Sequence, residues 1–408
     1  MEPATSQRGL YRSPRAAAIG ALALSLAVAS AQNATAQQAP AAVPGTSPAA
    51  ASELLATTLP KTAAQITGVG GVSCISATLC FAVGDATVTH GRTQLTSNTA
   101  LIWRYNGHAW RLSDRLRMRQ SALVSISCSS ASFCLAVGRV GNPSGHALAL
   151  RWNGRSWSPI GAPSPPSSGN GDALGSGACL SHADCWAVGG KNLGESAAGT
   201  HNTLLEHRNG RRLVLVSATG TGGSLVDVAC AGADACWATE RPIGRSSATY
   251  EIANFNGRRW APERLPIAMS GGEGAISCAT LTTCWIVGDR NSGGLRPAAV
   301  HLIDGTWQSV PMASPQHPDV TLQGIACVSE RDCWAVGSNE LVGPGIANPS
   351  EAAPFAEEWD GTSWRMAKIA GAARGFLVAV SCTSAGLCAA GGQSLAGDPL
   401  AAIATPLG

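Results

Sequence analysis

The sequence predicts an all-β fold, a seven-bladed β-propeller built from four-stranded antiparallel blades. Three observations lead to this prediction: seven cysteine pairs share one spacing, a short motif follows each pair, and a turn signal recurs between pairs. The chain has 408 residues, and a repeat of about 50 residues lies in the range typical of propeller blades.

The cysteine pairs define the repeat. Five residues separate the two members of every pair, and the first members recur at intervals of 54, 51, 51, 48, 49 and 55 residues. The string CWAVG begins at Cys185 and again at Cys333, and near-copies begin at the other second cysteines. All 14 cysteines belong to the pairs Cys74/Cys80, Cys128/Cys134, Cys179/Cys185, Cys230/Cys236, Cys278/Cys284, Cys327/Cys333 and Cys382/Cys388.

Each unit carries four strand signals. An alternating segment precedes the first cysteine, the CWAVG segment follows the second, a third segment ends in Asn-Gly or Asp-Gly, and a fourth usually opens with tryptophan. Asn-Gly and Asp-Gly are typical of type I′ hairpin turns, which need positive φ at both central residues. The pairs are Asn106-Gly107, Asn153-Gly154, Asn209-Gly210, Asn256-Gly257, Asp304-Gly305 and Asp360-Gly361.

The seventh unit lacks a fourth strand of its own. Its third strand is predicted at Leu400–Pro406, close to the end of the sequence given. The segment Leu54–Pro60, just before the first unit, has the length and terminal proline of a fourth strand. We expect it to complete the last blade and close the ring, which removes an open sheet edge.

We expect the two cysteines of every pair to form a disulfide, which gives one disulfide per blade. Opposed residues of a hairpin lie within disulfide range, and an exported chain with an even number of cysteines is expected to be oxidised. The pairs have no regular second set of ligands and the eight histidines are scattered, so we expect no metal and no cofactor. The regular placement of all 12 tryptophans favours packing between blades over sugar stacking.

The N-terminus predicts export. Residues 1–31 read as a signal peptide, with Arg8, Arg12 and Arg15 before an apolar run at Ala16–Val28. The small residues Ala29-Ser30-Ala31 predict cleavage after Ala31, and cleavage after Ala36 is an alternative site. The alternative to a signal peptide is a membrane anchor. Residues 32–51 form a Pro- and Ala-rich linker, and residues 52–408 form the propeller. We expect a secreted or extracytoplasmic chain with no transmembrane segment once the signal is removed.

Charge and motifs narrow the function. Only 13% of residues are charged and the net charge is +3, with no basic stripe, so a nucleic-acid partner is not expected. No nucleophile elbow, P-loop, dinucleotide fingerprint or His-Glu-x-x-His zinc motif is present. We expect a non-catalytic binding propeller, monomeric, with an extracellular or cell-envelope protein or polysaccharide as its ligand. The alternative is a secreted carbohydrate-active hydrolase or lyase with its site in the central funnel, because paired carboxylates need only meet in space.

The loops point to one face of the ring as the binding surface. Loops between the second and third strands, and from the fourth strand into the next blade, vary in length, and the longest spans residues 338–356. Variable loops on a rigid scaffold commonly carry binding residues. The candidates on this face are Arg139, Lys191, Glu195, His201, Arg241, Arg245, Asp289, Arg290, Arg296, Glu340 and Glu351.

The combination of CWAVG-like segments with Trp-Asn-Gly turns resembles secreted bacterial kelch-like propellers of the galactose-oxidase type. The resemblance covers roughly Leu54–Gly408 and implies the fold. The copper oxidases of this class carry a Cys–Tyr crosslink, whereas here every cysteine belongs to a pair. The resemblance therefore does not imply copper chemistry.

Overall fold

The computed structural model describes residues 53–61, 66–90, 95–141, 145–163, 171–191, 203–217, 223–241, 251–291, 295–313, 320–339 and 352–404. They belong to one unit, residues 50–408. The predicted signal peptide and linker lie outside the described residues. Within the described ranges, no helix is long and apolar enough to cross a membrane.

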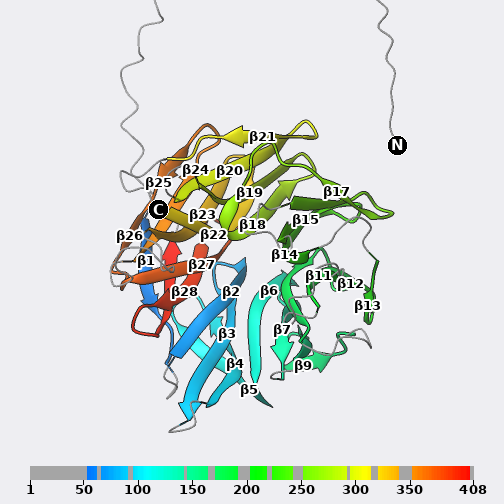
Figure 1. The fold of residues 1–408 in the computed structure, drawn as a ribbon. Helices are drawn as coiled ribbons and strands as arrows, with labels where there is room; N and C mark the ends of the chain where they lie inside the picture. The colour runs from blue at the N-terminus through cyan, green and yellow to red at the C-terminus, as the bar shows by residue number, and fades with distance from the viewer. Residues whose placement is uncertain are drawn as a thin grey trace, which may run out of the picture. The chain divides into compact units, whose positions relative to one another are not determined.

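The seven predicted blades are confirmed, and they follow one another in a ring (Figure 1). The first strand of each blade lies at the centre, where neighbouring first strands contact each other and β27 returns to β2. These inner strands are β2 (Ile66–Ser76), β6 (Ser121–Ser130), β10 (Ala173–Cys179), β14 (Ser224–Gly232), β18 (Ser270–Thr280), β22 (Val320–Ser329) and β27 (Gly375–Cys382).

The second and third strands follow outward by antiparallel pairing. The second strands are β3 (Leu79–His90), β7 (Phe133–Val140), β11 (Asp184–Gly190), β15 (Ala235–Arg241), β19 (Thr283–Asn291), β23 (Asp332–Asn339) and β28 (Cys388–Ser394). The third strands are β4 (Leu95–Tyr105), β8 (His146–Trp152), β12 (Thr203–Asn209), β16 (Glu251–Phe255), β20 (Leu295–Ile303), β24 (Ala353–Trp359) and β29 (Pro399–Ala404). The fourth strands of blades 1 to 6 are β5 (Trp110–Arg119), β9 (Trp157–Ile160), β13 (Leu213–Leu215), β17 (Trp260–Glu263), β21 (Thr306–Val310) and β25 (Trp364–Met366).

The N-terminal strand closes the ring, as the sequence predicts. Strand β1 (Glu53–Thr58) pairs antiparallel with β29, with Leu55 opposite Ile403 and Thr58 opposite Leu400. One feature differs from the prediction of four strands per blade. Strand β26 (Lys368–Ala370), which follows blade 6, pairs parallel with β1 and makes this sheet five-stranded. Both edges of β1 are therefore paired.

All seven predicted disulfides are present, one in each blade. In every pair the two cysteines lie directly opposite each other between the first and second strands, with Cα atoms 4.0 Å apart. Disulfides persist in oxidising compartments. Seven of them therefore indicate an oxidising, extracytoplasmic environment.

The two members of each pair differ in burial. The first cysteine is half-buried at the end of the inner strand. The second cysteine packs into the apolar clusters between blades. It is therefore a core residue, and its role is structural. Cys80, Cys134, Cys185, Cys236, Cys284 and Cys333 are fully buried, and Cys388 is 2% exposed.

The hairpin turns correct the prediction of type I′ geometry. Only Asp304-Gly305 has positive φ at both residues, in a two-residue loop between Ile303 and Thr306. In the other five pairs, all within the described ranges, only the glycine has positive φ. In blade 1, for example, Asn106 begins a four-residue loop and its Oδ1 accepts the N–H groups of His108 and Ala109. The Asn106 side chain thus accepts N–H groups that have no strand partner inside this longer turn.

The aromatic residues pack between blades. Each of the 12 tryptophans is at most 8% exposed. Trp186 in the second strand of blade 3 meets Phe255 and Trp260 of blade 4, with ring centroids 4.8 and 5.2 Å apart. Trp285 of blade 5 contacts Trp359 and Trp364 of blade 6 in the same way. The second strand of one blade is therefore joined to the outer strands of the next, as expected of packing residues.

The glycine of the CWAVG motif has a steric role. The first strand carries a β-bulge opposite this position, which brings its backbone onto the glycine. A Cβ on Gly337 would overlap the carbonyl oxygen of Thr321, and Gly84, Gly138, Gly189 and Gly392 face the same obstacle in their blades. The motif thus combines a disulfide, an inter-blade aromatic, two buried apolar residues and a close backbone approach.

We expect Gly337→Ala to lower the free energy of unfolding by roughly 3 kcal/mol, because a backbone carbonyl cannot move aside as a flexible side chain can. Denaturant unfolding of the oxidised protein measures this change. The control is Gly161→Ala, where a Cβ meets nothing within 4 Å. Equal stabilities of the two variants would contradict the steric role.

Candidate functional site

The strand order assigns the loops to two faces of the ring. We call the disulfide face the one that carries the loops between first and second strands and the turns between third and fourth strands. We call the variable face the one that carries the remaining loops. Of the eleven predicted binding residues, six are described by the structure. The other five, Glu195, His201, Arg245, Glu340 and Glu351, lie outside the described residues.

The central channel is lined almost entirely by small and aliphatic residues. A cavity of about 190 Å³ runs between the seven first strands, and Gly, Ala, Val, Ile and Ser form most of its described wall. Asp227 is the single charged residue among the described lining residues, and Gln323 is the other large polar one. The described wall therefore presents one carboxylate.

Asp227 joins three blades. Its Oδ1 accepts hydrogen bonds from Ser176 Oγ of blade 3, at 2.6 Å, and from the N–H of Val228. Its Oδ2 accepts the N–H of Ile276 of blade 5, at 2.9 Å. A carboxylate with several such donors is held in one orientation. This places Asp227 among the groups that hold the inner strands together.

Serines extend these links at the disulfide end of the channel. In four blades the residue before the first cysteine is a serine. Its hydroxyl oxygen accepts a hydrogen bond from the backbone N–H of the first cysteine in the next blade. Ser73 accepts from Cys128, and Ser381 accepts from Cys74 across the closure of the ring. Ser127 and Ser277 do the same toward Cys179 and Cys327. Alanine occupies this position in blades 3, 4 and 6.

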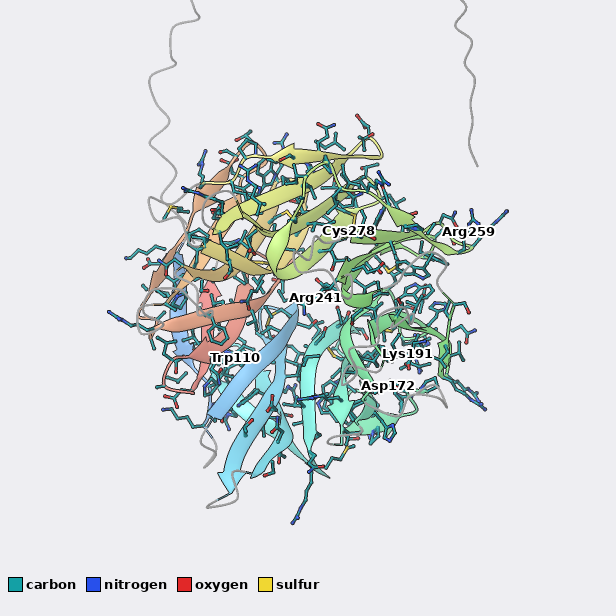
Figure 2. All side chains as sticks on the ribbon, viewed as in Figure 1. Trp110, Asp172, Lys191, Arg241, Arg259 and Cys278 are labelled. Carbon is teal, nitrogen blue, oxygen red and sulfur yellow. A yellow bond between two sulfur atoms is a disulfide. The ribbon has the colours of Figure 1, made fainter. Side chains whose placement is uncertain are left out.

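Three predicted binding residues occupy one repeated position at the variable-face end of the second strand. They are Arg139, Arg241 and Asp289, five residues after the second cysteine of their blades. The two arginines are exposed, and Figure 2 shows Arg241 close to the channel. The sequence predicts Asp289 as a surface binding residue. In the structure it is fully buried, so its carboxylate is not available at the surface.

Blade 1 places Asp85 at the same repeated position, and sequence reasoning missed it. Burial raises the pKa of the Asp85 carboxyl, while a hydrogen bond from Thr87 and the charge of Arg139 in the next blade oppose the rise. The alignment of the repeats could have identified this residue. Asp85 and Arg139 give the inner rim of the variable face charges of both signs.

Arg290 and Arg296 are brought together at a cleft of blade 5. The two residues lie directly opposite each other in the β19–β20 pair. They line a cleft of about 360 Å³ with Ile267, Pro297 and Met312. Like charges directly opposite each other destabilise a sheet, and neither arginine forms an ion pair within the described ranges. The remaining candidate, Lys191, is half-buried at the end of β11 in blade 3.

Among the described residues, no group of three or more His, Cys, Asp or Glu side chains is placed to hold an ion. The cysteines are consumed by disulfides.

Two buried glutamates were not expected from the sequence. Glu206 and Glu357 occupy equivalent positions in the third strands of blades 3 and 6, opposite Ala187 and Ala335, and both are fully buried. Burial raises the pKa of each to about 8, and for Glu206 the charge of Asp172 adds to the rise.

The surroundings of these glutamates also differ at one hydrogen-bond donor. Oε2 of Glu357 accepts the N–H of Ala313 at 3.1 Å. Alignment of the segments after β9 and β21 places Pro163 where Ala313 stands, and proline has no N–H to donate. Neither oxygen of Glu206 has a hydrogen-bond partner among the described residues.

Comparison with known proteins identifies the fold. No protein-family model matches the sequence, and no curated protein matches it. Among solved structures, YCF48 bound to D1 peptide aligns with a TM-score of 0.54 and 14% identity over 88% of this chain and 99% of that one. U3-55K aligns with a TM-score of 0.55 and 11% identity, over 86% and 98%.

Virginiamycin B lyase from Staphylococcus aureus, crystallised as a catalytically inactive variant with quinupristin, aligns with a TM-score of 0.50 and 11% identity over 86% of this chain and 98% of that one. At these identities the likeness shows the fold alone. The protein is a seven-bladed β-propeller, and its fold is consistent with a binding or interaction scaffold.

We expect Glu206→Gln to stabilise the protein more as the pH rises. The folded state keeps the Glu206 proton up to a pKa of about 8, against 4.5 for the ordinary group. The free energy of unfolding of the wild type therefore falls between these two pH values, and the glutamine variant lacks this loss. The gain at pH 8 relative to pH 5 should be roughly 2–4 kcal/mol.

Denaturant unfolding at both pH values measures the difference. The matched control is Asp304→Asn, an exposed acid in a turn. A Glu206→Gln gain that is independent of pH would show that the carboxyl is not protonated in the fold.

Proposed function

We propose that this protein is an exported, non-catalytic binding propeller whose ligand lies on the variable face. The observation that carries the proposal is the cleft of blade 5, where Arg290 and Arg296 face each other beside apolar residues. A negatively charged ligand would relieve the repulsion between the two guanidinium groups, and Ile267 and Met312 offer apolar contact. We infer an acidic ligand, a peptide or a polysaccharide of the cell envelope or its surroundings.

The composition of the channel supports binding over hydrolysis. Glycoside cleavage uses two carboxyl groups about 5–10 Å apart, whereas the described wall holds one, Asp227, which is engaged with three donors. Export is inferred from the N-terminal signal pattern, and the seven disulfides support it. Kinship with kelch-like propellers of the galactose-oxidase type is part of the same proposal, resting on the sequence resemblance.

The test immobilises the oxidised protein and exposes it to acidic and neutral peptides and to a polysaccharide panel, with the soluble phase assayed for released sugars. We expect retention of acidic ligands, weakened by rising salt, and no release. The double variant Arg290→Glu/Arg296→Glu should bind at least about tenfold more weakly, because charge-assisted contacts contribute about 1.5–3 kcal/mol each.

The matched control is Arg258→Glu, which reverses an exposed arginine at a hairpin turn on the disulfide face. Equal loss in the control and the double variant would place the binding outside the cleft. Released sugar would overturn the non-catalytic proposal.

A further inference from the structure

The interface between blades 2 and 3 departs from the repeat. Elsewhere the third-strand residue opposite the second cysteine is aromatic or apolar, such as Trp152, Phe255 or Trp359. In blade 3 this residue is Arg208, opposite Cys185, and the fourth strand opens with Leu213 in place of tryptophan. The loss of aromatic bulk coincides with a cavity of about 470 Å³ on the disulfide face between the two blades.

The walls of this cavity carry positive charge and hydroxyl groups. Two arginines line it, Arg151 from β8 and Arg208 from β12, together with His182. Its described lining contains no Asp or Glu. The serines of the lining are Ser129, Ser130, Ser132 and Ser181.

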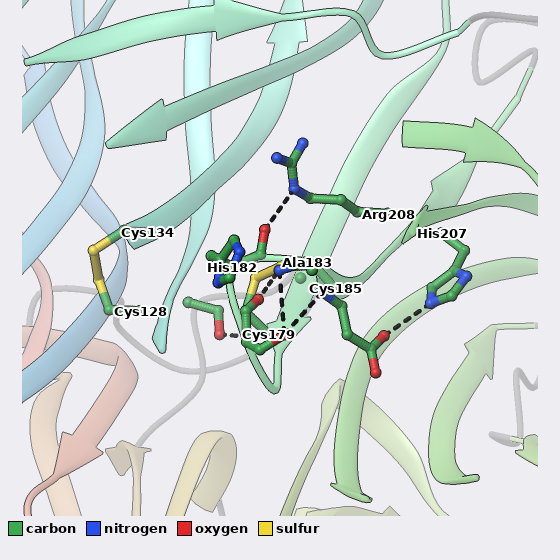
Figure 3. Close-up of a disulfide and its surroundings, with 12 residues drawn as sticks. Cys128, Cys134, Cys179, His182, Ala183, Cys185, His207 and Arg208 are labelled. Atoms are coloured by element: carbon green, nitrogen blue, oxygen red, sulfur yellow. Dashed lines mark hydrogen bonds and ion pairs between the residues drawn. A yellow bond between two sulfur atoms is a disulfide. The ribbon is translucent and has the colours of Figure 1, made fainter. Parts of the chain in front are cut away.

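Arg208 is held in place by hydrogen bonds that use only part of its guanidinium group. The residue is 3% exposed and its guanidinium lies 5.4 Å from the ring centroid of Phe133. Nε donates to the carbonyl oxygen of His182 at 2.9 Å (Figure 3). Nη1 donates to the carbonyl oxygen of Arg211 at 2.7 Å. A guanidinium has five N–H groups, so these two bonds leave three for another acceptor.

Arg151 has a buried donor without an acceptor. Its Nε is enclosed and forms no hydrogen bond within the described ranges. An unsatisfied buried donor is costly, and a second positive charge nearby adds to that cost. Burial lowers the pKa of Arg208, and the positive charge of Arg151 lowers it further. The two guanidinium groups therefore lie close enough to repel each other.

The nearby acids do not neutralise this pair. Asp184 forms a hydrogen bond at 2.8 Å with Nε2 of His207, whose side chain projects from the opposite face of β12 to that of Arg208. Glu206 shares the face of Arg208 but lies nearer the variable face. No ion pair joins Glu206 to either arginine in the described part of the chain.

We propose that the pocket between blades 2 and 3 binds an oxyanion, a phosphate, sulfate or carboxylate group, between Arg151 and Arg208. The planar guanidinium fork matches such groups in two-point contacts, and the serine hydroxyls supply further donors. The pocket opens on the disulfide face, opposite the proposed ligand surface, so it is a second site independent of the proposed function.

The test records the arginine Nε–Hε signals of the oxidised protein by NMR. Sodium phosphate, sodium sulfate and N-acetylglycine are titrated separately at constant ionic strength, which separates site binding from general screening. We expect a saturable shift of the Arg151 signal with at least one of the three. A shift with phosphate or sulfate alone assigns the site to tetrahedral anions, and a shift with N-acetylglycine extends it to carboxylates.

Variants connect the shift to the pocket. Arg151→Gln should weaken binding about tenfold or more, read from the signal of Arg208, and Arg151→Lys, which keeps the charge, should weaken it less. The control Arg155→Gln removes an exposed arginine from the neighbouring turn and should leave binding unchanged. No saturable shift with any of the three anions, or the same loss in the control, would overturn the proposal.

Discussion

Closure of the ring at β1 and β29 is the constraint on which the rest of the structure depends. In a linear stack of repeats each terminal unit exposes an unpaired face and needs a special cap. Here the first strands of all seven blades contact two neighbours, including the contact between β27 and β2. The hydrogen bond from the N–H of Cys74 to Ser381 Oγ repeats at the closure the link found within the chain. The N-terminal strand thus supplies the fourth strand of the last blade.

A closed ring also explains why the sequence motif varies so little from blade to blade. Neighbouring blades pack through apolar clusters that are rich in tryptophan at several interfaces, and in five blades the motif glycine faces the backbone of a β-bulge. A change in one blade therefore has to be accommodated at the same interface. Blade 4 departs from the motif, because Glu240 replaces the glycine and its carboxylate accepts the N–H of Gly223 in the same blade. Arg208 departs from the repeat in a way that packing does not explain, since aromatic or apolar residues stand at this position in the other blades.

Much of this architecture follows from the sequence, because repetition converts weak local signals into one consistent pattern. The spacing of the cysteines was sufficient to predict the seven blades and their disulfides. The lack of a fourth strand in the last unit was sufficient to predict that β1 completes that blade. The turns were predicted incorrectly, since Asn-Gly alone does not distinguish a two-residue loop from the four-residue loop that Asn106 stabilises with its own side chain. Strand β26 was missed because three residues of parallel pairing leave no periodic pattern.

The candidate sites were less accessible to sequence reasoning. The pairing of Arg290 with Arg296 depends on strand register, and the enclosure of Asp289 depends on neighbouring chain segments. Arg151 and Arg208 are 57 residues apart in sequence and meet only because consecutive blades pack face to face. The sequence marks this site only by the absence of tryptophan from the fourth strand of blade 3, which opens with Leu213. That departure indicates a gap in the aromatic packing, and the two charges beside it are seen only in the structure.

Hydrogen–deuterium exchange across residues 53–60 and 399–404 tests ring closure most directly. Strand β1 is paired on both sides, with β29 and with β26, so its amides should be as well protected as those of β29. Both segments should lose protection together as denaturant opens the ring. Exchange of residues 53–60 at the rate of an unstructured terminus, while β29 stays protected, would contradict closure by the N-terminal strand.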